Sequence, residues 1–256
     1  MLRIQRLNMD NSWFFDLDGV RFIVDPWLTG KEVDFFSWFN TQWHRTRPLP
    51  PNEVPEHHFV LVTQKYPDHF HKETLRLLNP GKIIVPASVE KKCKRLLPDA
   101  EVIIFNEGLV NPFGLPLRIH FLPTRRKIDP IYDALVIENG RQSVFLASHG
   151  FSLERQHLDR VRTLPPFALL IAPMNLYQLP AMLGGRVSPG IASVKKLANE
   201  LKAGKIAATH DEDKFAKGIV SKFAHIVRAP APDILKSDDL FGDRYLHIPD
   251  YLPIEL

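Results

Sequence analysis

Short apolar runs separated by turn residues dominate the start of the chain. Residues 12–17 alternate loosely between apolar and polar side chains, and residues 20–24 form a strongly apolar run. Asp18 and Gly19 lie between the two runs and are typical of a tight turn, because both residues tolerate a positive φ angle. This pattern predicts a β-meander over the first thirty residues.

From residue 59 onward, strand-like runs alternate with helix-like runs. Asn139 and Gly140 between two apolar runs are the clearest hairpin signal in the chain. Hairpins mixed with β–α units predict an α/β (α+β) fold in which helices cover two mixed sheets. The predicted strands are 59–63, 82–86, 101–105, 116–121, 133–137, 143–147, 167–172 and 205–208, and the predicted helices are 72–78, 88–97 and 190–202.

An aromatic and proline-rich segment at about 30–58 follows neither pattern. It contains Phe35, Phe36, Trp38, Phe39 and Trp43 and then the proline-rich run 48–51. We expect a loop or short-helix insertion without regular structure, within one domain that spans residues 1–256. The insertion could form a pocket wall or lid, or a contact in a homo-oligomer, because clustered aromatic side chains are enriched at interfaces.

Composition narrows the class of protein further. A chain of 256 residues that is 45% hydrophobic can bury a large core without disulfides, and the single Cys93 excludes an internal disulfide and a cysteine metal cluster. Lys+Arg 33 against Asp+Glu 29 gives a net charge of +4, which is too small to indicate nucleic-acid binding. No secretory signal or membrane-spanning run is recognisable. We therefore expect a cytoplasmic protein without a membrane or nucleic-acid partner.

Several predicted strands end in residues that commonly bind metals. Asp68 and His69 follow one strand, whereas His149 and His210 each follow another. A carboxylate oxygen and imidazole nitrogens are donors that Zn²⁺ and similar ions accept, and such sites can leave room for water. If these strands lie side by side, the four side chains meet at one rim of the sheets.

Each of these residues also has an ordinary structural explanation. A single histidine at a strand end more often makes a hydrogen bond than binds a metal. Asp68 or His71 could cap the helix at 72–78, and Asp25 before Pro26 is expected to hold its turn through backbone hydrogen bonds. The coincidence of one aspartate and three histidines at strand ends nevertheless favours a metal site.

The order of the motifs resembles the metallo-β-lactamase superfamily. The motifs are Val-Asp-Pro-Trp-Leu at 24–28, Val-Thr-x-x-x-x-Asp-His at 62–69, Leu-Ala-Ser-His-Gly at 146–150 and Ala-Thr-His-Asp at 208–211. They are most similar to the lactonase-like branch of metal-dependent hydrolases, over about residues 10–225. The resemblance implies a four-layer αββα sandwich of two mixed β-sheets flanked by helices, with a metal site at one edge.

The family motif Thr-His-x-His-x-Asp-His is only partly present. Gln64 and Tyr66 stand where the family has its first two histidines, and residues 122–126 lack the later histidine that the family has there. All three ligands of the family's first metal are therefore missing. Gln64 and Tyr66 become candidate catalytic groups that orient water or substrate, although ordinary packing at a strand end explains them as well.

The ligands of the family's second metal are retained. Asp68, His69 and His210 match them, and His149 stands where the family has a bridging aspartate. The resemblance thus implies one divalent ion, with Zn²⁺ first and Mn²⁺ or Fe²⁺ as alternatives. Asp68 could serve both as a ligand and as the acceptor of a proton from an activated water.

These expectations favour a metal-dependent hydrolase that acts on a lactone, ester or phosphoester. Arg125 and Arg126 follow a strand that should end near the same rim. They could bind the carboxylate or phosphate of an anionic small-molecule substrate, although basic runs are often only solvated turns. The alternative is a catalytically degenerate protein that acts as a binding or regulatory module, because three family ligands are missing. A nuclease is a third candidate, and the modest charge argues against it.

Overall fold

Two seven-stranded mixed sheets pack face to face in the computed structural model, which describes residues 1–106, 108–124 and 133–256. The first sheet has the order β20 (Ile254–Glu255), β1 (Leu2–Arg6), β2 (Trp13–Leu17), β3 (Val20–Val24), β6 (Phe59–Leu61), β7 (Lys82–Pro86) and β8 (Glu101–Phe105). The second has the order β19 (Tyr245–Leu246), β16 (Lys205–Ala208), β13 (Phe167–Ala172), β12 (Ser143–Leu146), β11 (Ala134–Glu138), β10 (Arg118–Leu122) and β9 (Gly108–Val110).

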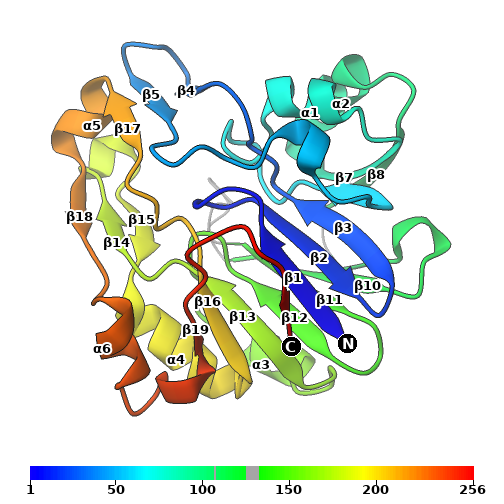
Figure 1. The fold of residues 1–256 in the computed structure, drawn as a ribbon, viewed down its shortest axis with the longest axis vertical. Coiled ribbons are helices and arrows are strands. Elements are labelled where there is room, and N and C mark those ends of the chain that lie inside the picture. Colours follow the sequence, from blue (N-terminus) through cyan, green and yellow to red (C-terminus); the bar gives the residue numbers. More distant parts are fainter. Residues whose placement is uncertain (107, 125–132) are drawn as a thin grey trace.

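Helices cover the outer faces of both sheets. α1 (Lys72–Leu78) and α2 (Glu90–Leu96) bury apolar side chains against the first sheet, and α3 (Arg155–Val161) and α4 (Ile191–Leu201) do so against the second. Figure 1 shows the two pairs at opposite sides of the molecule. The predicted αββα sandwich is confirmed. The shorter helices are α5 (Ile219–Phe223), α6 (Pro232–Lys236) and the 3₁₀ turns Pro51–Glu53, Ala87–Val89, Pro112–Gly114, Ala181–Leu183 and Gly242–Arg244.

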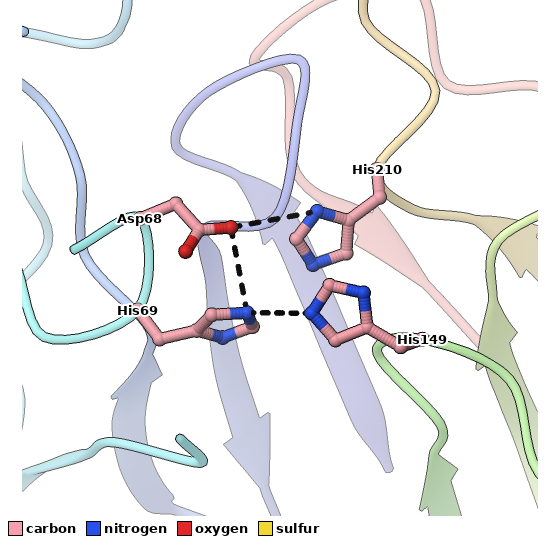
Figure 2. Close-up of side chains that lie close together, drawn as sticks. All are labelled: Asp68, His69, His149 and His210. Carbon is pink, nitrogen blue, oxygen red and sulfur yellow. Dashed lines mark hydrogen bonds and ion pairs between the residues drawn. The ribbon is translucent and has the colours of Figure 1, made fainter. Parts of the chain in front are cut away.

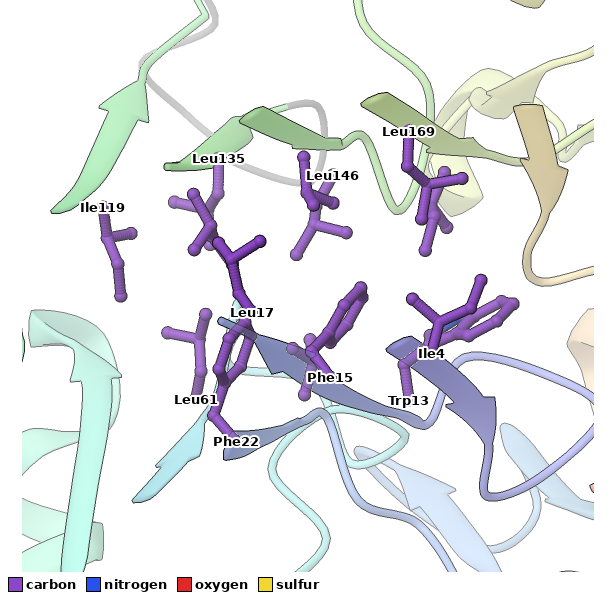
Figure 3. Close-up of a cluster of buried hydrophobic side chains, with 14 of the residues drawn as sticks. Ile4, Trp13, Phe15, Leu17, Phe22, Leu61, Ile119, Leu135, Leu146 and Leu169 are labelled. Carbon is purple, nitrogen blue, oxygen red and sulfur yellow. The ribbon is translucent and has the colours of Figure 1, made fainter. Parts of the chain in front are cut away.

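The main core lies between the two sheets. Apolar side chains at alternate positions of each strand point inward, so that Phe15 and Leu61 of the first sheet face Leu135 and Leu146 of the second (Figure 3). Each such fully buried side chain contributes about 1.5–3 kcal/mol relative to exposure. Close packing of many of these side chains fixes how the two sheets lie against each other, and hence where their edges meet.

Strand pairing follows the predicted pattern in most places. β1, β2 and β3 form the predicted antiparallel meander, with Asp18 and Gly19 at positive φ in its tight turn. β6, β7 and β8 then continue the sheet as parallel strands. β6 ends two residues earlier than predicted, because the chain leaves the sheet at Val62 and Thr63 to enter the loop that carries Asp68. None of the helices in the described ranges is long and apolar enough to cross a membrane.

The prediction that residues 30–58 contain no regular structure was wrong. This segment forms β4 (Glu32–Asp34) and β5 (Asn40–Trp43), which pair with β17 (Phe215–Lys217) in a small sheet. A second small sheet contains β15 (Arg186–Pro189), β14 (Leu176–Gln178) and β18 (His225–Val227). Figure 1 shows both beyond the ends of the large sheets. Strands this short, with a partner some 170 residues away, leave no clear period in the sequence.

Candidate metal centre

Asp68, His69, His149 and His210 come from loops at one edge of the sandwich. Asp68 and His69 follow β6 of the first sheet, whereas His149 and His210 follow β12 and β16 of the second. One donor atom from each residue lies within 4.8 Å of the donor atoms of the other three. Figure 2 shows the four side chains pointing toward one another. The structure therefore brings together all four residues that the sequence singled out.

Distances within the cluster match the spacing of ligands around one ion. His69 Nε2 lies 3.1 Å from His149 Nε2 and 3.5 Å from Asp68 Oδ2, and His210 Nδ1 lies 3.9 Å from the same Asp68 oxygen. Donor atoms in a tetrahedral zinc site with bonds of about 2.0–2.1 Å lie about 3.3–3.4 Å apart. The cluster thus needs only small side-chain adjustments to hold a cation.

Asp25 fixes the ring of His69. Its Oδ2 accepts a hydrogen bond from His69 Nδ1 at 2.7 Å, and its two oxygens also accept hydrogen bonds from the backbone N–H and hydroxyl of Thr63. A carboxylate that accepts the Nδ1 proton selects the tautomer whose Nε2 can bind a metal. The expectation that Asp25 only holds its own turn was therefore incomplete.

The environment of His210 also fits a cation. Its Nε2 atom is buried and has no hydrogen-bond partner among the described residues, which is unusual for a buried polar atom. Its backbone N–H donates to the Asp10 carbonyl at 2.9 Å, so the loop between β1 and β2 holds it in place. Asp25 and His210 both adopt positive φ angles, which cost about 1–3 kcal/mol each outside glycine.

Charge in the cluster is concentrated on one ring. Burial opposes a charged His69, but Asp68 and Asp25 outweigh burial and raise its pKa to about 9. Burial, helped by the charge of His69, lowers the pKa of His149 to about 3, and burial also lowers the pKa of His210. Near neutral pH one positive charge therefore lies among the rings. A bound cation would take the place of the Nε2 proton of His69.

A cavity of about 700 Å³ opens onto the cluster. Asp68, His149 and His210 line one part of it, and residues of the two small sheets and of the segments that flank them line the rest. Lys214 lines it as well and donates to Asp10 Oδ2 at 2.8 Å. Burial disfavours the lysine's charge, but the nearby carboxylates, Asp10 foremost, raise the pKa of Lys214 above its usual value. The cavity thus contains a permanent ammonium group.

Only some of the other predicted site residues lie at the cavity. Tyr66 lines the cavity, whereas Gln64 is buried outside its lining, so only Tyr66 is placed to meet a substrate. His71 accepts a hydrogen bond from the backbone of Thr74, which confirms it as the cap of α1 and leaves Asp68 free of that role. Arg125 and Arg126 lie outside the described residues.

Sequence reasoning missed several charged residues that line or support the cavity. Lys214 and Glu32 line it, and Asp10 supports Lys214 from a fully buried position. The run Asn8–Ser12 between two strands was a detectable signal for Asp10, because four of its five residues are polar and interrupt an apolar pattern. Glu32 and Lys214 lie in unremarkable polar stretches, and only the small sheets bring them to the site.

Comparison with known proteins finds similar structures but no similar sequence among family profiles or curated proteins. No protein-family profile matches the chain, and no curated protein matches it in sequence. A possible metal-dependent hydrolase from Veillonella parvula is similar, with a TM-score of 0.70, 14% identity and coverage of 100% of this chain and 98% of that one. An isothiocyanate hydrolase from Delia radicum gut bacteria gives a TM-score of 0.69, 14% identity and coverage of 99% and 98%.

A third similar structure belongs to a protein whose fold has a name. It is a metallo-beta-lactamase fold protein from Bacillus subtilis, with a TM-score of 0.61, 12% identity and coverage of 99% of this chain and 98% of that one. At identities this low, the similarity concerns the backbone architecture and says nothing about the active site. The paired sheets, the covering helices and these similarities together show that the chain has the metallo-β-lactamase fold.

Proposed function

We propose that this protein is a metal-dependent hydrolase of a lactone, ester or phosphoester, with a mononuclear site formed by Asp68, His69, His149 and His210. The observation that supports the proposal is the meeting of these four donors within 4.8 Å at the wall of a cavity. Three neutral nitrogens and one carboxylate favour Zn²⁺, with Mn²⁺ or Fe²⁺ as alternatives. The solved hydrolases of the same fold are consistent with this chemistry.

A divalent ion held there would act as a Lewis acid, lowering the pKa of a coordinated water toward ~7 and polarising the scissile carbonyl or phosphoryl group. Asp68 lies at the cavity wall, so its carboxylate can accept the proton of the attacking water and pass it to the leaving group. Asp25 keeps the Nε2 atom of His69 free of a proton when the site is occupied.

Two further groups that line the cavity can stabilise the developing negative charge. Tyr66 lines the cavity beside Asp68, and its hydroxyl can donate a hydrogen bond to the oxyanion. Lys214 lines the same cavity with a charged ammonium that Asp10 holds at 2.8 Å. A fixed positive charge in a buried site stabilises an oxyanion more than one in water would, because it needs no reorganisation.

Metal content and hydrolysis test the proposal together. The purified chain, loaded with Zn²⁺, Mn²⁺ or Fe²⁺ and then dialysed, should retain about one equivalent of ion by elemental analysis. His69→Gln and His210→Gln should lose it, whereas His225→Gln, at an exposed histidine outside the cluster, should not. The loaded protein should hydrolyse at least one member of a panel of aryl lactones, carboxylic esters and phosphoesters.

A binding or regulatory module without hydrolytic activity is the second candidate. The observation that favours it is the presence of Gln64 and Tyr66 at positions where the resemblance calls for metal-binding histidines. Failure of the chain to retain any of the three ions, with a normal circular dichroism spectrum, would reject the hydrolase and leave this module.

A further inference from the structure

Two acidic side chains of β4 lie at the cavity and do not belong to the cluster of Asp68 and the three histidines. Glu32 and Asp34 both line the cavity, and Glu32 is only 3% exposed. Asp34 Oδ2 accepts a hydrogen bond from Asn40 at 2.9 Å. Among the described residues, none donates a hydrogen bond to the carboxylate of Glu32 or forms an ion pair with it. An acidic group this deeply buried normally has a partner.

The charge of Lys214 acts on both carboxyl groups and favours their ionised forms, but burial outweighs it. Burial, and after it the nearby charges of Asp68 and Asp34, raises the pKa of Glu32 well above its usual value. Burial and Asp68 raise the pKa of Asp34 to about 6. A positive charge placed between the two groups would remove this penalty, because an opposite charge within a few ångströms favours the ionised form.

The charged groups elsewhere in the cavity already have partners. Lys214 donates to Asp10 at 2.8 Å, and Arg228 donates to Asp213 at 2.8 Å. Glu212 contacts His44 at 2.6 Å. Among the described residues that line the cavity, neither Lys214 nor Arg228 forms an ion pair with Glu32 or Asp34. Lys214 therefore compensates the two carboxylates only in part, and a ligand can supply the remaining positive charge.

Three aromatic side chains share the cavity lining with the two carboxyl groups. Phe35 and Phe39 line the same cavity, and their rings meet edge to face at 5.4 Å. Tyr177 also lines it and lies close enough to Glu32 and Asp34 for their charges to act on its phenol. Carboxylates combined with aromatic faces recognise organic ammonium groups through ion pairing and cation–π attraction, whereas hydrated metal ions prefer oxygen donors alone.

We propose that Glu32 and Asp34 form a subsite for an organic cation, so that the natural ligand carries an ammonium or guanidinium group on an apolar body. The inference rests on the proposed function for the position of the reactive bond, which would lie at the Asp68 end of the cavity. It differs from the expectation of an anionic substrate, which depended on Arg125 and Arg126 and not on the described lining.

A pair of probes that differ in charge tests the subsite. Isothermal titration calorimetry would compare 2-phenylethylammonium chloride with the neutral 2-phenylethanol, on the full chain with and without loaded zinc. We expect the ammonium to bind at least tenfold more tightly than the alcohol. Glu32→Gln combined with Asp34→Asn should remove that difference. Asp213→Asn, which removes a carboxylate of the same cavity that Arg228 already neutralises, should change affinity less than twofold.

Several results would overturn the subsite. The first is equal affinity of the unmodified chain for the two probes. The second is a preference for the ammonium that persists in the double variant. The third is a loss of ammonium affinity in Asp213→Asn as large as that in the double variant. A response to Mg²⁺ at matched ionic strength that disappears in Glu32→Gln would assign these carboxylates to a metal ion instead. The comparison of probes on the unmodified chain is decisive even if a variant folds poorly.

The outcome is separable from the proposed function. Ammonium binding without retained zinc would reject the hydrolase and keep the subsite. Retained zinc and ester hydrolysis without a preference for the ammonium would reject only the subsite.

Discussion

Asp25 illustrates how a residue beyond the four cluster residues determines what they can do. Its carboxylate is buried, bonds to Thr63 and holds the Nδ1 atom of His69 at 2.7 Å. From the sequence, Asp25 before Pro26 was expected only to hold a turn. The hydrogen bond to His69 spans 44 positions along the chain, so no local pattern announces it. Asp68, His69, His149 and His210 could be singled out because each follows an apolar strand.

Asp25→Asn should weaken metal binding without unfolding the chain. An amide oxygen can still accept the Nδ1 proton of His69, but it lacks the negative charge that makes the imidazole a good donor. Loss of such an outer partner costs about 10–100-fold in metal affinity. Competition with a zinc chelator measures the change, and Asp16→Asn, which removes a turn carboxylate at Gly19, is the control. Equal affinity in Asp25→Asn and the unmodified chain would contradict the role assigned to Asp25.

Cys93 should be inert in the folded protein. The thiol is fully buried against the first sheet, and burial raises its pKa to about 11. At pH 8 only about one thiol in a thousand is then ionised, and the thiolate is the reactive form. Iodoacetamide at pH 8 should leave the native chain unmodified and add one group per chain in guanidinium chloride, as read by mass spectrometry. Rapid modification of the native chain would show that α2 opens easily.

At the scale of elements, the long strands could be predicted and the short ones could not. Predicted strands 82–86, 101–105, 167–172 and 205–208 have the observed bounds, because each is a short, mainly apolar run that follows a helix. The small sheet of β4, β5 and β17 depends on pairing between segments far apart in sequence, so local pattern says little about it. That small sheet carries Glu32 and Asp34, so these two acidic residues of the cavity were not predicted from the sequence.

Gly218 connects β17 to α5 at a point where no side chain fits. Its φ is +111°, and an added Cβ would lie 2.5 Å from the carbonyl oxygen of Phe39. Gly218→Ala should lower the free energy of unfolding by about 2 kcal/mol or more, because strain and a backbone clash add. Gly19→Ala is the matched control, since Gly19 also has a positive φ but open space around it. Denaturant unfolding compares the two, and an equal loss in both would argue against the clash.

At the scale of the whole molecule, the candidate metal centre joins the two large sheets. Asp68 and His69 belong to loops of the first sheet, and His149 and His210 to loops of the second. The sandwich could be predicted from the family resemblance, because its motifs lie at strand ends in the family order. The contacts that set the spacing of the sheets could not, because they depend on how dozens of buried side chains fit together.

Zinc should therefore stabilise the entire fold. An ion that binds the folded chain only, at 100 times its dissociation constant, adds about 2.7 kcal/mol. For a chain of this size that raises the midpoint of thermal unfolding by roughly 5–10 °C. Differential scanning calorimetry with zinc or with a chelator measures the shift, and His210→Gln should abolish it. A shift that persists in His210→Gln would place the stabilising ion elsewhere.

Phe15 and Leu146 lie in the packed layer between the sheets and contribute no donor atom to the centre (Figure 3). A smaller side chain there would let one sheet settle differently on the other and alter the separation of donors that belong to opposite sheets. Measurements of zinc affinity in core variants would then detect changes in the packing between the sheets as well as changes at the centre itself. Natural variation deep in this sandwich could tune its affinity for the ion while every residue of the centre stays unchanged.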